Sequence, residues 1–230
     1  GWVMGDKNTH DRLVREIAVR TGAAVVFVNY TPSPEAQYPV PLRQIMTALR
    51  YIVAHADELK LDAARIAVAG DSVGGNMAAA LTLMCKAENG PRLRFQLLLY
   101  PVTDASLDTD SYREFADGPW LTKKAMEYFW DAYAPDKKSR REITASPLLA
   151  TAEQLKGLPP AFVITDANDV LRDEGEAYAV RLMQAGVPTG AAPYAGTIHD
   201  FLMLDAVADT IPAKAALAQA CGVLREALAE

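Results

Sequence analysis

The chain has 230 residues, of which 50% are hydrophobic and 23% charged, and its net charge is −6. This length suits one domain with a substantial core, and the composition is that of a soluble globular protein. The acidic charge provides no basic surface for nucleic acid or anionic lipid, and no apolar run approaches the roughly 20 residues that span a bilayer. Because the chain starts at Gly1 without an initiator methionine or a signal pattern, we interpret position 1 as a cut inside a longer protein and expect a cytoplasmic protein whose targeting stays open.

Five runs rich in β-branched or other apolar residues predict strands at residues 23–30, 65–69, 95–100, 161–165 and, more weakly, 190–194. Helical periodicity predicts helices between and after them, at residues 41–57, 76–86, 122–133, 174–185 and from about 210 to 228. This alternation is typical of an α/β protein with a mostly parallel sheet and helices on both faces. The continuous apolar runs further predict strands that are buried on both sides.

Residues 104–147 depart from this alternation because they contain no predicted strand. They include the helical block 122–133, for which Thr122 is the expected N-cap and whose aromatic residues share one face. Connections of this length are uncommon unless they are functional. Two interpretations stay open: an ordinary helical crossover with a packing face, or a wall of a substrate pocket with Trp120 at its rim.

The hexapeptide at residues 70–75 has the sequence Gly-Asp-Ser-Val-Gly-Gly and joins the predicted strand at 65–69 to an apolar helix. A Gly-x-Ser-x-Gly match has a mechanical meaning at such a turn, where the strained backbone projects the serine hydroxyl above the edge of the sheet. The N-terminal N–H groups of the following helix favour negative charge at that point. The sequence therefore predicts Ser72 as a nucleophile, and the alternative is a glycine-rich turn with an incidental serine.

A serine nucleophile needs a base to take its proton, and the chain has three histidines. His10 precedes a helix near the start of the chain, and His55 lies late in an amphipathic helix among charged residues. His199 lies in the loop after the last predicted strand. Because such loops emerge at one edge of a parallel sheet, the edge where Ser72 is expected, elimination favours His199 as the base.

The acid that orients the imidazole has three candidates after the predicted strand at 161–165. Asp166 ends the strand, and Asp173 lies in the first turn of the next helix, where an acid can simply serve the helix dipole. Asp169 lies in the loop between them, where it is best placed to reach His199. The resulting order of serine, aspartate and histidine is the one expected for this kind of serine turn.

With these motifs the chain resembles the bacterial hormone-sensitive-lipase family of esterases. The matching segments are 70–76, 169–175, His199 with Phe201, and 30–35, and the similarity runs from residue 1 to about 204. The resemblance implies an α/β-hydrolase fold, with residues 1–230 as a single catalytic domain and 104–147 as a helical insertion that lines the pocket. It also implies Asp169 as the triad acid. Val73 stands where alanine is usual in the family, and Asp200 where glycine is usual.

The front of the chain departs further from the family. The family's oxyanion loop is His-Gly-Gly-Gly followed by an aromatic residue, and Gly1-Trp2 resembles only its end. The resemblance assigns the oxyanion-binding N–H groups to Gly1 and Val73, and losing one such donor costs roughly a hundred- to a thousandfold in rate. The family also has an N-terminal cap and early strands before this loop. We therefore expect that the functional protein had these first strands and the cap.

The resemblance implies a serine carboxylesterase for short- to medium-chain esters, which works through an acyl-enzyme on Ser72 without a metal or organic cofactor. Its partner is then a small-molecule ester, and a homodimer is an option that the sequence leaves open. Two alternatives also remain: an amide or acetyl hydrolase with the same triad, and a non-catalytic small-molecule receptor on the same fold. Such receptors usually lack the base, whereas His199 is present.

Overall fold

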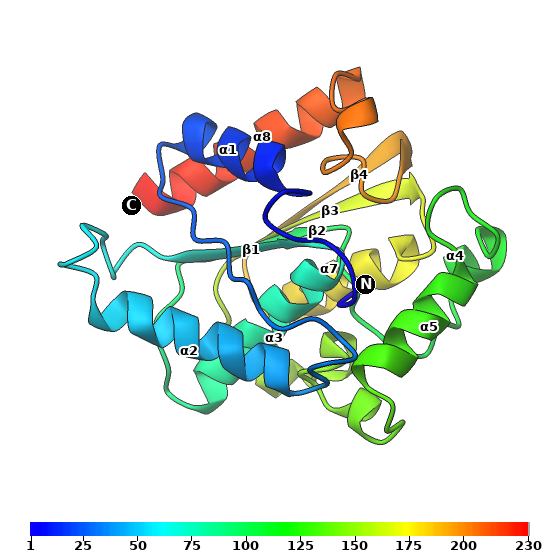
Figure 1. Ribbon diagram of the computed structural model, residues 1–230, viewed down its shortest axis with the longest axis horizontal. Coiled ribbons are helices and arrows are strands. Elements are labelled where there is room, and N and C mark those ends of the chain that lie inside the picture. Colours follow the sequence, from blue (N-terminus) through cyan, green and yellow to red (C-terminus); the bar gives the residue numbers. More distant parts are fainter. Residues whose placement is uncertain (230) are drawn as a thin grey trace.

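Four parallel strands form the sheet in the computed structural model, which describes residues 1–229. The strands are β1 (Ala67–Asp71), β2 (Phe95–Leu99), β3 (Ala161–Asn168) and β4 (Thr189–Ile198), in the spatial order β1-β2-β3-β4. The register pairs Ala67 with Phe95, Gln96 with Ala161, and Ala161 with Thr189. The carboxyl ends of all four strands therefore meet at one edge, toward which the arrowheads of β3 and β4 point in Figure 1. The predicted parallel α/β sheet is confirmed.

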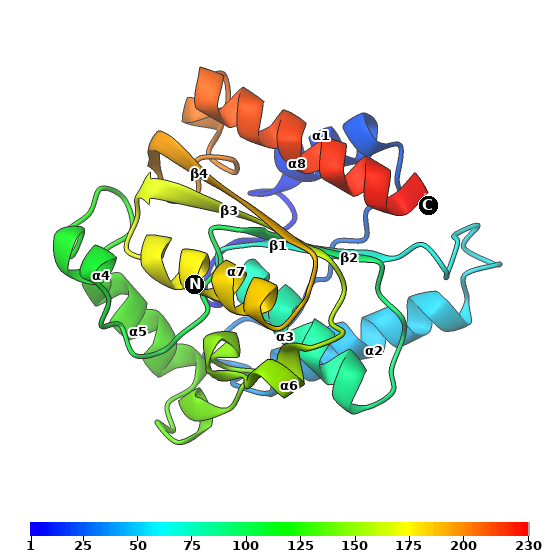
Figure 2. The same cartoon turned by 180° about the vertical axis from the view of Figure 1, so that it is seen from behind.

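Helices cover both faces of this sheet, as Figures 1 and 2 show from opposite sides. On one face lie α1 (Asp11–Thr21) and α8 (Ile211–Ala229), which pack on each other. On the other face, α3 (Val73–Ala87) packs on β1 and β2, α7 (Arg172–Gln184) packs on β3 and β4, and α2 (Val40–Ala54) lies outside α3. None of the helices in residues 1–229 combines the length and the apolar character that crossing a bilayer requires.

The four strands are buried unevenly. Every residue of β2 is buried, and so are the residues of β3 up to its last two positions. Most residues of β1 and β4 are exposed or partly exposed. The prediction of strands buried on both sides is therefore correct for the two inner strands and wrong for the two outer ones. The reason is position, because an outer strand has a neighbouring strand on one side only.

The strand predicted at residues 23–30 is wrong, since this segment lies outside the sheet. Val25 and Val26 are 38% and 51% exposed. Valine favours an extended backbone, but a strand exists only through ladder hydrogen bonds to a neighbour, and none of the four strands pairs with this run. Extended residues without a partner stay irregular, which the composition of the run does not reveal.

The connection from β2 to β3 is helical, as predicted for residues 104–147. It contains α4 (Asp110–Glu114), α5 (Lys123–Tyr133), 3-10 helices at Ser139–Arg141 and Pro147–Leu149, and α6 (Ala152–Leu155). Elsewhere in the chain, a 3-10 helix at Asp205–Val207 precedes α8. Thr122 caps α5 as predicted, because its Oγ1 accepts a hydrogen bond from the Ala125 N–H at 3.1 Å. The buried ring of Tyr133 stacks on that of Trp2, with 4.1 Å between centroids. This stack anchors the N-terminal segment beside α5.

Candidate active site

Ser72 occupies the turn between β1 and α3, at the carboxyl edge of the sheet. Its backbone has φ 55° and ψ −119°, a conformation that residues other than glycine rarely adopt. The turn is tight because the helix approaches the strand closely. A Cβ on Gly70 would lie 2.1 Å from the carbonyl carbon of Gly74, and a Cβ on Gly75 would lie 2.8 Å from Cβ of Pro101. Gly70 and Gly75 are thus a packing requirement of this elbow.

Three side chains that the sequence singled out meet at this edge. Nδ1 of His199, from the loop after β4, lies 2.7 Å from Oδ2 of Asp169, and Nε2 lies 2.9 Å from Oγ of Ser72. Because a carboxylate only accepts hydrogen bonds, Nδ1 carries the proton and Nε2 is left to accept from the serine hydroxyl. All three side chains are buried. A nucleophile, a base and an orienting acid within hydrogen-bond reach can deprotonate a serine for attack on an electrophile.

Further contacts fix the imidazole and its acid. The ring of Tyr100 meets that of His199 edge-on, with 5.1 Å between centroids. Asp169 also accepts the backbone N–H of Leu171 at Oδ1, at 3.1 Å. Burial lowers the pKa of His199, but the negative charges of Asp169 and Asp200 outweigh burial and raise this pKa. These carboxylates therefore stabilise the imidazolium, the form that appears once the serine proton has been taken.

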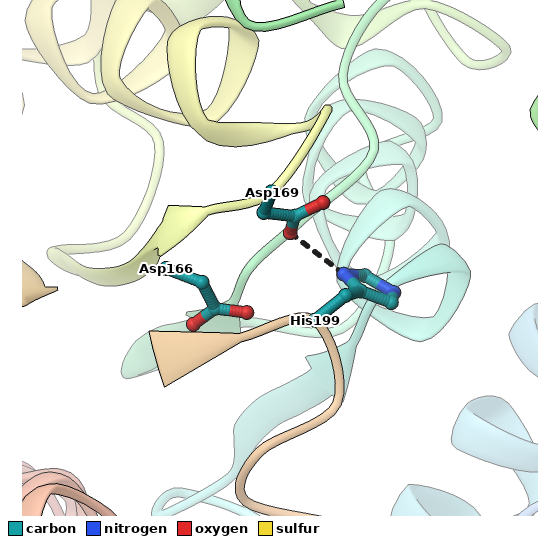
Figure 3. A group of neighbouring side chains, drawn as sticks. All are labelled: Asp166, Asp169 and His199. Atoms are coloured by element: carbon teal, nitrogen blue, oxygen red, sulfur yellow. Dashed lines mark hydrogen bonds and ion pairs between the residues drawn. The ribbon is translucent and has the colours of Figure 1, made fainter. Parts of the chain in front are cut away.

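Figure 3 shows another buried carboxyl group, Asp166, beside the Asp169–His199 pair. Neither of its oxygens has a hydrogen-bond partner among residues 1–229. Burial, and then the charge of Asp169, raise the pKa of Asp166 well above its ordinary value, so the neutral acid is favoured. Donor atoms of these three residues lie within 4.8 Å of one another, a set of types that metals also bind. Both imidazole nitrogens already have protein partners, so the serine site accounts for the group.

His10 binds the elbow from a distant part of the sequence. Its Nε2 donates to Oδ2 of Asp71 at 2.9 Å, and both side chains are 17% exposed. Its Nδ1 lies 3.0 Å from Oγ1 of Thr9. The hydrogen bond to Asp71 is the largest cause that raises the pKa of His10. Burial would raise the pKa of Asp71, but the hydrogen bond and charge of His10 lower it. The pair ties the segment before α1 to the residue before Ser72.

Val73 and Gly1 are the two residues predicted to bind an oxyanion. Val73 is the first residue of α3, so its N–H has no acceptor within the helix and points from the positive end of the helix dipole. Gly1 lies against α5, where an added Cβ would come 2.6 Å from the ring of Phe129. The part of both residues in binding an oxyanion stays a prediction.

Trp120, predicted at the rim of the pocket, contacts the loop that carries the histidine. Its Nε1 donates to Oδ2 of Asp200 at 3.1 Å, and Oδ1 of Asp200 lies 3.4 Å from Nε2 of His199. The Trp120 side chain is 60% exposed. One residue thus separates Trp120 from the imidazole, and its contact with substrate stays a prediction.

Sequence reasoning missed the role of His10 and treated Asp166 only as a rival acid. No local pattern signals either placement, because the contact between His10 and Asp71 spans 61 positions and Asp166 approaches His199 only through the pairing of β3 with β4. Asp200 did carry a signal, since a charged residue follows the histidine where the related esterases usually have glycine. That signal did not predict the hydrogen bond from the Trp120 indole to the Asp200 carboxylate.

Comparisons with known proteins agree with this geometry. The family described as alpha/beta hydrolase fold matches residues 1–203. Carboxylesterase NlhH of Mycobacterium tuberculosis is 39% identical over 203 residues, which cover 88% of this chain and 64% of that protein. An ethyl acetate hydrolase of Pseudomonas putida is 35% identical over 210 residues, which cover 90% and 65%. The chain thus spans just under two thirds of the length of these two relatives.

Comparison with a solved structure also shows similarity to an esterase. The crystal structure of a thermostable esterase from Pseudomonas putida superposes with a TM-score of 0.97 at 52% sequence identity, over 99% of this chain and 71% of that one. The parallel sheet, the strained serine turn and these matches point to one origin. The chain belongs to the alpha/beta hydrolase fold family.

Proposed function

We propose that this chain carries the active site of a serine carboxylesterase of the hormone-sensitive-lipase type, which hydrolyses short- to medium-chain carboxylic esters. The observation that carries the proposal is the unbroken hydrogen-bonded path from Ser72 Oγ through His199 to Asp169, with spacings of 2.9 and 2.7 Å. The names of the relatives, esterase, carboxylesterase and ethyl acetate hydrolase, support the ester as the substrate class. The complete triad argues against a receptor that has lost its base.

The reaction is acyl transfer to water. Ser72 Oγ attacks the ester carbonyl carbon while His199 Nε2 takes its proton, and Asp169 stabilises the imidazolium. The backbone N–H groups of Val73 and Gly1 bind the oxyanion of the tetrahedral intermediate. His199 then gives its proton to the departing alcohol oxygen, which leaves the acyl group on Ser72. Water, deprotonated by the same imidazole, attacks the acyl-enzyme and releases the acid and the free serine.

Replacing the nucleophile tests this proposal. Ser72→Ala should lower kcat for a nitrophenyl ester by roughly 10⁵- to 10⁶-fold, because the acyl-enzyme cannot form. The measurement is release of nitrophenol by the intact protein and by the variant, with an organophosphate as a label for the reactive serine. Turnover by Ser72→Ala equal to that of the parent protein, or covalent labelling at another residue, would contradict the assignment.

A further inference from the structure

A carboxylate stands next to the atom that hands the proton to the leaving group. Asp200 directly follows His199, and its Oδ1 lies 3.4 Å from His199 Nε2. Its Oδ2 accepts the indole N–H of Trp120 at 3.1 Å. The Asp200 side chain is 19% exposed, so its charge is only partly screened by solvent. The contacts of its two oxygens are thus an indole and an imidazole, and neither is a permanent cation.

The position of Asp200 limits where any substrate can sit. For His199 Nε2 to protonate the departing oxygen, that oxygen must come within about 3.2 Å of it. Since Nε2 is itself 3.4 Å from the carboxylate, the leaving oxygen lies within about 7 Å of Asp200 in every productive complex. This upper limit on the distance between the leaving oxygen and Asp200 depends only on the positions of the triad and of Asp200. It holds whatever other residues shape the rest of the pocket.

We propose that Asp200, held by Trp120, makes the site select esters whose alcohol part carries a positive charge and reject those whose alcohol part carries a carboxylate. The inference rests on the proposed esterase activity and names its substrate class. A cation two or three bonds beyond the leaving oxygen lies within Coulomb range of the carboxylate. The Trp120 ring, 60% exposed, offers a face for a cation–π contact with the same group.

The selectivity grows as the alcohol leaves. The departing oxygen takes its proton from His199, so the imidazolium that had offset the charge of Asp200 becomes neutral again at that step. A cationic group in the alcohol then remains beside an uncompensated carboxylate, whereas a neutral alcohol gains nothing from it. The preference should therefore appear in kcat/KM, which reports the transition state.

The test uses two esters that differ by one charge: the acetate ester of choline, and its uncharged isostere in which a carbon atom replaces the ammonium nitrogen. The ratio of kcat/KM for the cationic ester to that for the neutral one should exceed unity. It should fall by about three- to tenfold in Asp200→Asn, as expected for loss of one charge at this range. Rising ionic strength should shrink the ratio in the parent protein. An effect of the variant on the pKa of His199 cancels, because both esters use the same base.

Two controls keep the result interpretable. Asp57→Asn removes one charge from an exposed residue between α2 and β1, at the edge of the sheet opposite Ser72, and should leave the ratio unchanged. Asp200→Gly serves as a second variant, because Asp200 has φ 65° and glycine adopts this region freely. An unchanged ratio in both Asp200 variants, each still labelled at Ser72, would overturn the proposal. If the parent protein hydrolyses neither ester and Ser72 is not labelled, the esterase function itself fails, and the selectivity with it.

Discussion

Two buried aspartates near His199 differ in what surrounds them. Both carboxylate oxygens of Asp169 accept a hydrogen bond, one from His199 Nδ1 and the other from the Leu171 N–H. Asp166, three residues earlier, has no partner at either oxygen among the described residues. An unpaired buried carboxylate is costly, so Asp166 favours its neutral form, and the raised pKa has this cause. Two neighbouring buried acids can thus hold different charges.

This difference predicts opposite outcomes for two matched variants. Asp169→Asn should lower kcat by about 10⁴-fold, because an amide cannot stabilise the imidazolium or fix its tautomer. Asp166→Asn should change kcat little, because an amide replaces a neutral carboxyl group of the same shape. The measurement is kcat/KM against pH. The acidic limb of this pH profile reports the pKa of His199. If Asp166 were charged, the Asp166→Asn substitution would lower that pKa and move the limb to lower pH. Because Asp166 favours its neutral form, we expect the limb to stay where it is in the parent protein.

How far the sequence could identify these residues depends on how local their signals are. Ser72 was predictable because its strand, turn and helix are contiguous. His199 was predictable because the chain offered few histidines. Asp169 was the best placed of three nearby acids, and the family resemblance selected it over its neighbours. The contact between Trp120 and Asp200 was unpredictable, because it depends on how the helical connection folds over the sheet edge.

At the level of elements, the elbow depends on close contact between β1 and α3. Gly70→Ala should destabilise the fold by about 3 kcal/mol or more, because its Cβ would overlap the backbone of Gly74 at 2.1 Å. Gly74→Ala is the matched control, since a Cβ there meets its nearest neighbour, Asp71 Oδ1, at an ordinary 3.6 Å. The two variants are compared by urea unfolding. Equal stability would show that the backbone shifts to accommodate either methyl group.

The contact of the segment before α1 with the end of β1 should depend on pH. The folded-state pKa of His10 is raised by Asp71, so its contribution to stability is complete below about pH 6.5 and is lost as pH rises through the raised value. The pKa of Asp71 is lowered, so its contribution is lost only as pH falls through that lowered value. His10→Gln should therefore cost about 1 to 2 kcal/mol near pH 6.

Chemical unfolding of the parent protein and of His10→Gln, at about pH 6 and about pH 9, checks this expectation. The gap between their free energies of unfolding should narrow at the higher pH, where the imidazole is neutral. A gap of constant size would mean that packing, such as the tilted contact of His10 with the Phe27 ring, accounts for the stabilisation instead of charge.

Helices were predicted better than strands for a physical reason. The periodicity of α2 and α5 is a property of one segment, because each helix satisfies its own backbone hydrogen bonds. A strand needs a partner, so the valine-rich residues 23–30 matched the composition of a strand without forming one. The extent of β4 was underestimated for the same reason, since its last residues are held by pairing with the end of β3.

For the whole molecule, the strand order predicts which parts open first. β2 and β3 are flanked by strands on both sides and are almost wholly buried, whereas β1 is flanked by β2 alone. Backbone amides of β2 and β3 should therefore exchange with deuterium only on global unfolding, and those of β1 through smaller openings. Peptide-resolved exchange measures this order. Protection of β1 equal to that of β3 would contradict it.

The geometry of the elbow also governs what mutational scanning of this site can reveal. The donor proposed at position 73 is the backbone N–H that begins α3, so every side-chain replacement except proline keeps it. The Val73 side chain itself is buried in the core. An alanine scan would therefore report the loss of packing at this position and leave the proposed donor untested. Replacing that amide by an ester bond in the main chain would expose its contribution.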